Sequence, residues 1–116
     1  MIIATLRIKV PGERRKDFLD SAQFIAGPTK VQPGCISCRF YQDLDDPDAI
    51  LFVEEWKSRE GLDRHIKSDS YRIILSLMEL SAETPEFKLN TISEAEGLEA
   101  IEVLRSYDID RHNSGT

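Results

Sequence analysis

The chain has 116 residues, with 15 Lys or Arg against 21 Asp or Glu and a formal net charge of -6. This length predicts one domain with a single core. The acidic balance argues against nucleic acid and anionic membrane surfaces as partners, because binding phosphates needs a surplus of basic side chains on one face. The first ten residues lack the features of a signal peptide, and no apolar run is long enough to span a bilayer, so we expect a soluble, cytoplasmic protein.

The first predicted element is a strand over residues 2–10, in which every second residue is apolar. Pro11-Gly12 then opens a predicted helix. Gly27-Pro28 is expected to end or kink that helix. The apolar residues that recur in it at helical spacing are Phe18, Leu19, Ala22, Ile25 and Ala26.

Two further alternating stretches, over residues 35–43 and 50–56, predict a pair of antiparallel strands. Asp45-Asp46-Pro47-Asp48 joins them as a turn, because Asp caps its own backbone and Pro presets φ. On the first of these strands, one face is expected to carry Ile36, Cys38 and Phe40, and the other Ser37, Arg39 and Tyr41.

Ser58 is placed to cap the next helix, on which Leu62, His65 and Ile66 line one side. Ser68-Asp69 offers a break, and a second helical piece is expected over residues 70–82. That piece is apolar most of the way round, so it needs cover on two sides, and in a domain this small the second cover is expected from another subunit. With a fourth strand over residues 86–92, the order is βαββαβ, an α+β ferredoxin-like fold with an antiparallel sheet and its helices on one face.

The region after the fourth strand predicts a C-terminal helix over residues 96–107, where Leu98, Ile101 and Leu104 make one apolar stripe. This helix is a candidate to lie across a partner subunit. Residues 108–116 have almost nothing to bury and are predicted to be disordered. We therefore expect one domain over residues 1–95, followed by the helix and the tail.

The block from Val31 to Tyr71 holds several short motifs whose order and spacing together are distinctive. They are Pro33-Gly34-Cys35, Tyr41-Gln42-Asp43, Asp46-Pro47, Glu54-Glu55-Trp56, Leu62, His65 and the pair Ser70-Tyr71. In these motifs the chain resembles the antibiotic biosynthesis monooxygenase family, although that family usually has a His-Phe-like pair where Ser70-Tyr71 stands.

The resemblance implies a homodimer in which two sheets pack into an α+β barrel. It also implies a cofactor-independent monooxygenase that acts on a small aromatic, quinol- or anthrone-like substrate with dioxygen. In such chemistry the deprotonated substrate itself passes an electron to dioxygen. The protein must deprotonate the substrate, orient it and exclude water.

Two residues of this block are candidates for catalysis. Trp56 is the only tryptophan, and the matching family residue lines the substrate pocket, where a flat indole suits an aromatic ligand and its N–H can anchor one polar atom. The alternative is that Trp56 only fills the core. His65 could take a proton from a phenolic or enolic substrate. The alternative for His65 is a core-edge histidine bonded to backbone.

Candidates for substrate binding lie on several elements. Arg7 and Arg39 could hold an anionic oxygen with Tyr41 nearby. Such arginines more often pair across strands with acids, and Glu54 or Glu55 is available. The helix-side wall of a pocket, or simply ordinary core, would come from Tyr71, Phe18, Ala22 and Met78.

The sequence gives little indication of a metal or cofactor. Cys35 and Cys38 form a C-x-x-C string, but residues three apart on a strand point to opposite faces, so we expect buried, reduced thiols. His65 and Asp69 have i, i+4 spacing, yet two weak ligands make a poor metal site. The haem-degrading branch of the superfamily relies on an Asn in the first strand and a His in the second helix, which this chain lacks at both places. With no phosphate loop or flavin signature, no cofactor is expected.

Two other functions stay open at this point. One is a non-catalytic small-molecule binding or stress-related module, since fold does not fix function. The other is a cofactor-free isomerase of a small carbonyl compound, in which His65 would shuttle a proton without dioxygen.

Overall fold

The computed structural model describes the backbone of residues 1–114 and the side chains of residues 1–106. The strands form one sheet in the order β2-β3-β1-β4, with each neighbouring pair antiparallel. This confirms the predicted α+β, ferredoxin-like arrangement. The elements in chain order are β1 (Ile2–Lys9), the 3-10 turn η1 (Gly12–Arg14), α1 (Arg15–Lys30), β2 (Cys35–Gln42), β3 (Ala49–Trp56), α2 (Arg59–Lys67), α3 (Tyr71–Glu79), β4 (Glu86–Thr91) and α4 (Leu98–Ser114).

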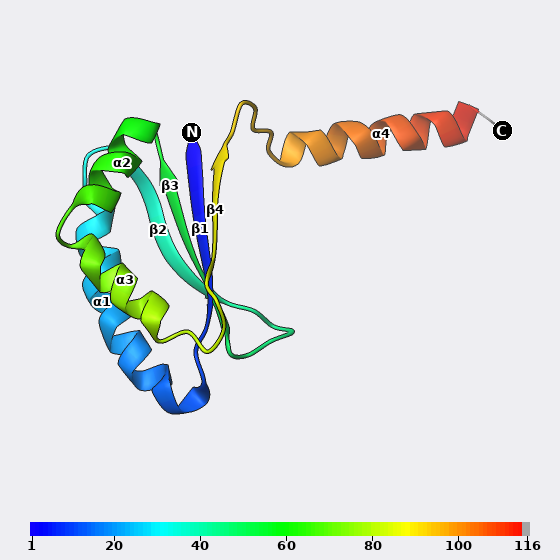
Figure 1. Ribbon diagram of the computed structural model, residues 1–116. Helices are drawn as coiled ribbons and strands as arrows, with labels where there is room; N and C mark the ends of the chain where they lie inside the picture. Colours follow the sequence, from blue (N-terminus) through cyan, green and yellow to red (C-terminus); the bar gives the residue numbers. More distant parts are fainter. Residues whose placement is uncertain (115–116) are drawn as a thin grey trace.

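The sheet and the helices form two layers. Figure 1 shows α1, α2 and α3 on one face of the sheet, whereas α4 extends away from both layers. The core lies between the layers, where burial of apolar side chains supplies the main stabilising term. The predicted alternation of the first strand is confirmed, because its buried residues are Ile2, Ala4, Leu6, Ile8 and, just beyond the strand, Val10.

A bulge near the start of β2 changes which way its first residues face. Cys35 lies opposite Trp56 on β3, and Ser37 lies opposite Glu55, so Ile36 is the extra residue. The side chain of Ile36 is 47% exposed. The prediction that Ile36 faces the core is therefore wrong, because strict alternation fails where one strand carries an additional residue.

The same bulge brings the two cysteines onto one face of the sheet. Cys35 is paired with Trp56 and Cys38 with Glu54, and both of these partners are buried on the helix-covered face. The prediction that the two thiols point to opposite faces is therefore wrong. Both cysteines are free, Cys38 buried and Cys35 partly buried.

The first helix is longer than the sequence predicted. α1 continues through Gly27 and Pro28 and ends at Lys30. Of the two expectations for this dipeptide, an end or a kink, the end is therefore wrong. A proline removes one helical hydrogen bond, but here the loss falls in the last turn. That turn buries Thr29 and carries the chain to Gln32, whose side chain reaches the site described below.

The second helical region is divided as predicted. Ser58 caps α2, since its side chain accepts a hydrogen bond from the Gly61 N–H at 3.4 Å. The helix breaks over residues 68–70, where the Ser68 hydroxyl donates to the His65 carbonyl at 2.6 Å. α3 then buries one face and leaves the other partly exposed.

The C-terminal helix α4 begins at Leu98 and continues to Ser114, past residue 107 where the sequence predicted its end. The last part of the predicted disordered tail, residues 115–116, lies outside the described residues. The large apolar side chains of α4 that are described are exposed, and its placement across a partner stays a prediction. Within residues 1–114, no helix is long and apolar enough to cross a membrane.

Candidate active site

The end of β3 places the single tryptophan in the core. Residues of β3 alternate between the two faces, so Glu54 and Trp56 both point toward the helices. Trp56 is fully buried, and the backbone passes close to its ring at two glycines. A Cβ at Gly61 would lie 3.3 Å from the indole carbon Cε3, and one at Gly34 would lie 3.9 Å from it. Gly34 also has a φ of 88°, which favours glycine.

Helix α2 stacks His65 on the indole. The ring centroids of Trp56 and His65 are 5.0 Å apart, with an interplanar angle of 29°. Tyr71, the first residue of α3, meets the same imidazole edge-on at 5.2 Å. Each of the three residues is at most 6% exposed. The structure therefore brings together Trp56, His65 and Tyr71, which the sequence singled out, in a closely packed and nearly closed cluster.

The cluster also contains an acidic residue that was not predicted from the sequence. Glu54 is 2% exposed, and its Oε2 lies 2.8 Å from the Nε2 of His65. The distance suits a hydrogen bond, but the two groups meet obliquely, and neither atom has an aligned hydrogen-bond partner among the described residues. The other ring nitrogen, Nδ1, lies 3.1 Å from the side-chain Oε1 of Gln32. His65 thus has one polar neighbour at each nitrogen.

The charge of Glu54 also raises the pKa of a phenol and two thiols near it. Burial, followed by the charge of Glu54, raises the pKa of the Tyr71 phenol to about 12. The same two causes raise the pKa of the Cys38 thiol to about 12, and that of Cys35 in the same direction. These three groups are therefore neutral at neutral pH.

A further polar atom in the cluster lacks a partner. The indole Nε1 of Trp56 is buried and donates no hydrogen bond to the described part of the chain. A buried donor without an acceptor costs about 1–3 kcal/mol. Such a donor is available to a polar atom of a ligand.

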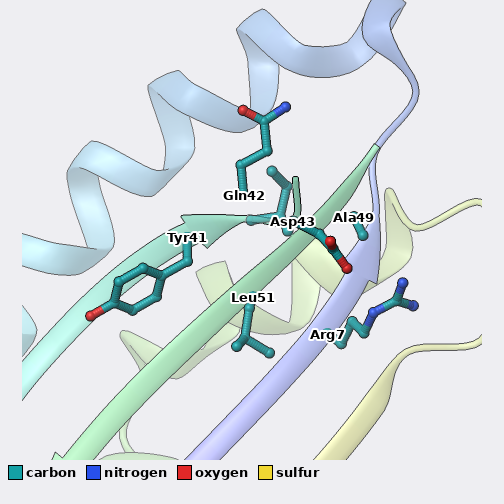
Figure 2. A pocket seen from close by; sticks show the side chains of 7 residues that line it. Arg7, Tyr41, Gln42, Asp43, Ala49 and Leu51 are labelled. Carbon is teal, nitrogen blue, oxygen red and sulfur yellow. The ribbon is translucent and has the colours of Figure 1, made fainter. Parts of the chain in front are cut away.

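The predicted arginines lie on the opposite face of the sheet from His65. Arg7 and Tyr41 both pair with Leu51, one from each side, and Figure 2 shows Leu51 between them. These three residues help to line a pocket of about 170 Å³. Arg39 is exposed on the same strand as Tyr41.

The charged partner of Arg7 is not the one considered from the sequence. The Nη2 of Arg7 lies 3.6 Å from the Oδ2 of Asp46. Glu54 faces the helices, so the suggestion that it pairs with a strand arginine is wrong.

The remaining predicted pocket residues lie in the core on the helix side. Phe18 is fully buried and packs edge-on against Phe40, with centroids 5.5 Å apart. Ala22 and Tyr71 belong to the same core cluster, and Met78 packs against it. Phe18 also lines a surface pocket of about 280 Å³ between α1 and β2. His65 lines neither this pocket nor the one beside Arg7.

The described residues contain no group of three or more His, Cys, Asp or Glu side chains that could hold a metal ion. The candidate site consists of Glu54, His65, Trp56, Tyr71 and Gln32. Alternation along β3 could have revealed Glu54, because it stands two residues before Trp56. No signal in the sequence points to Gln32.

Comparison with known proteins agrees with this fold. The family model for antibiotic biosynthesis monooxygenases matches residues 1–74, and the chain belongs to this family. The match includes every residue of the candidate site and ends within α3.

Individual proteins are also similar to this chain in sequence or structure. The chain is 31% identical to sll1783, an uncharacterized protein of Synechocystis sp., over 98 residues that cover 84% of this chain and 67% of that protein. A conserved protein of Methanosarcina mazei has a similar structure, with a TM-score of 0.73 and 29% identity over 77% of this chain and 89% of that chain. A provisionally assigned antibiotic biosynthesis monooxygenase of Deinococcus radiodurans has a TM-score of 0.75 at 20% identity, covering 84% of this chain and 97% of that chain. This last likeness shows the fold alone.

Proposed function

We propose that the protein is a cofactor-independent monooxygenase that oxidises a small aromatic, quinol- or anthrone-like substrate with dioxygen. Membership of the family supports the class of reaction. The observation that carries the proposal is the buried contact between Trp56, His65 and Glu54, in which a base, an acid and an unpaired indole N–H meet.

In the proposed reaction, His65 removes a proton from the substrate, which stacks in the indole-lined site. The substrate anion passes one electron to dioxygen, and the two radicals combine into a peroxide. The peroxide loses water, so a CH2 carbon and O2 become a carbonyl and H2O. Both electrons that reduce the second oxygen come from the substrate, and no external reductant is needed.

The close packing around His65 favours a second candidate function. Because His65 is only 2% exposed, a ligand must displace side chains to reach it. A module that binds a small molecule without converting it would have the same packing. The two candidates differ in whether dioxygen is consumed.

Oxygen uptake with anthrone separates these functions. We expect uptake above the rate of spontaneous oxidation, and a loss of about 100-fold or more in His65→Ala, since general bases contribute about 10²–10⁴-fold. The only other histidine in the chain, His112, gives the matched control His112→Ala, which should keep full activity. Unchanged turnover in His65→Ala would reject the proposed base. Anthrone binding without uptake would establish the second function, and conversion of a carbonyl compound without oxygen would indicate an isomerase.

A homodimer is part of the proposal. The sheet face opposite the helices carries half-buried apolar residues, among them Ile3, Leu51 and Val53, which a second sheet would cover. Val53→Glu places a charge on this face and should yield monomers in sedimentation velocity. A monomeric wild-type protein would reject the dimer.

A further inference from the structure

We propose that Glu54 is a positioning residue that holds His65 through Nε2, so that Nδ1 is the nitrogen that receives the substrate proton, and that Gln32 occupies the substrate's place at Nδ1. This inference rests on the proposed function and extends it to two residues with no assigned role.

The two sides of the imidazole differ in their surroundings. Nε2 faces Glu54, which is 2% exposed and lies within the core. Nδ1 faces Gln32, which is partly exposed and lies on the connection between α1 and β2. The solvent-facing side of the imidazole is therefore its Nδ1 side, where the Gln32 side chain lies in the place that a ligand would take.

Gln32 is held by its backbone and not by its side chain. Its backbone N–H donates to the Thr29 carbonyl and its carbonyl accepts from the Cys35 N–H, each at 3.1 Å. These bonds fix the backbone of the connection. The hydrogen bonds of the Gln32 side chain include no second partner in the described chain beyond the imidazole, so the amide can leave Nδ1 by a change of rotamer alone.

Glu54 is the charged group that faces the imidazole. The charge of Glu54 also acts on Tyr71, Cys35 and Cys38, and burial and that charge disfavour ionisation of all three. Among the described residues, Lys30 is the cation that acts on the two thiols, and its charge lowers their pKa. Glu54 is therefore the group placed to balance a positive charge on His65.

The proton transfer follows from this geometry. In the structure Nδ1 faces the Gln32 Oε1, which can only accept, so Nδ1 carries the ring proton in that contact. When Gln32 leaves, that proton is held on Nε2, facing Glu54, and Nδ1 becomes the unprotonated nitrogen. The acidic C–H of an anthrone or O–H of a quinol takes the vacated position, that bond breaks and an Nδ1–H bond forms. Nε2–H stays directed at the Glu54 carboxylate, which stabilises the resulting imidazolium in a site of low dielectric. The oblique contact between Glu54 and His65 is consistent with this role, because catalytic hydrogen bonds often become aligned only when the substrate binds.

Three substitutions test the inference. Glu54→Gln keeps the size and the acceptor oxygen but removes the charge, and should lower kcat for anthrone by about 100-fold with little change in KM. Gln32→Ala vacates the position at Nδ1 and should lower KM several-fold while kcat is kept. Glu55→Gln makes the same chemical change on the adjacent residue, whose side chain lies on the other face of the sheet, and should keep wild-type kinetics.

A spectroscopic readout separates positioning from mere support of the fold. The ring-nitrogen shifts of His65 can be followed by ¹⁵N NMR in a His112→Gln background, which has a single imidazole. We expect Glu54→Gln to change these shifts and Glu55→Gln to leave them unchanged, with both variants folded.

The outcomes distinguish this inference from the proposed function. Turnover of anthrone that is unchanged in Glu54→Gln, or His65 shifts that do not respond to it, would overturn the role of Glu54. A higher KM in Gln32→Ala would overturn the role of Gln32. If wild-type protein consumes no oxygen but the His65 shifts respond to Glu54→Gln, the proposed function fails while the contact between acid and base stands.

Discussion

The buried pair of Glu54 and His65 makes a strong prediction about stability. Both side chains are 2% exposed, and their nearest polar atoms are 2.8 Å apart. Removing one partner of such a pair leaves a buried charge without compensation, which costs about 3–5 kcal/mol. We therefore expect His65→Leu to lower the free energy of unfolding by this amount.

The two partners are not equivalent. Glu54→Met should cost less, about 1–3 kcal/mol, because an imidazole can remain neutral in the core whereas the carboxylate must take up a proton to do so. The double variant Glu54→Met/His65→Leu removes both polar groups and should approach the wild-type stability, since apolar replacements of buried pairs are often neutral. The two single losses add to about 4–8 kcal/mol and nearly vanish in the double variant, so the coupling energy between the two sites should be about 4 kcal/mol or more.

The assay is urea unfolding followed by the fluorescence of Trp56, the only tryptophan in the chain. All variants are compared at one protein concentration, because the stability of the proposed dimer would depend on concentration. Additive effects of the two substitutions would refute the reasoning, as would a loss below about 1 kcal/mol in His65→Leu.

Three shorter predictions follow from other contacts. Burial holds the pKa of the Cys38 thiol at about 12, so a thiol reagent at neutral pH should modify at most one cysteine in the folded protein and both after denaturation. Gly61→Ala should lower the free energy of unfolding by about 1–3 kcal/mol, because the new Cβ would lie 3.3 Å from the indole. Gly27 lies in α1, and a Cβ there would meet nothing within 4 Å, so Gly27→Ala should stabilise the fold by about 0.5–1 kcal/mol. Equal unfolding midpoints for these two variants would contradict both predictions. A hydrogen bond from Lys9 lowers the pKa of Asp46, so this carboxylate stabilises the fold above its ordinary pKa and stops doing so as pH falls through the lowered value. Asp46→Asn should therefore reduce the loss of unfolding free energy with falling pH. A pH dependence identical to that of the wild type would count against the ion pair.

Local chemistry made much of the fold predictable from the sequence. The hairpin turn formed where acidic residues cap their own backbone: Asp43 accepts from the Asp45 N–H at 2.8 Å and Asp46 from the Asp48 N–H at 3.2 Å. The α2 cap at Ser58 was predicted for the same reason. These features depend on neighbours within a few residues.

The candidate site was less predictable because its contacts join distant residues. Trp56 and His65 stand out by residue type, but Glu54 was first interpreted as a partner of strand arginines, although it shares a face with Trp56. The contact between Gln32 and His65 joins residues 33 positions apart. Nothing in the composition around Gln32 indicates that contact, which depends on how the connection between α1 and β2 closes.

Three exceptions to local rules fall within residues 28–36, and each affects the site. α1 continues through Pro28, Gly34 adopts a positive φ, and β2 bulges at Ile36. Together they shape the connection that brings Gln32 to the imidazole and Gly34 against the indole. Local rules fail most often where function requires an unusual backbone, so this connection and the facing part of α2 are where substrate access to His65 should be sought.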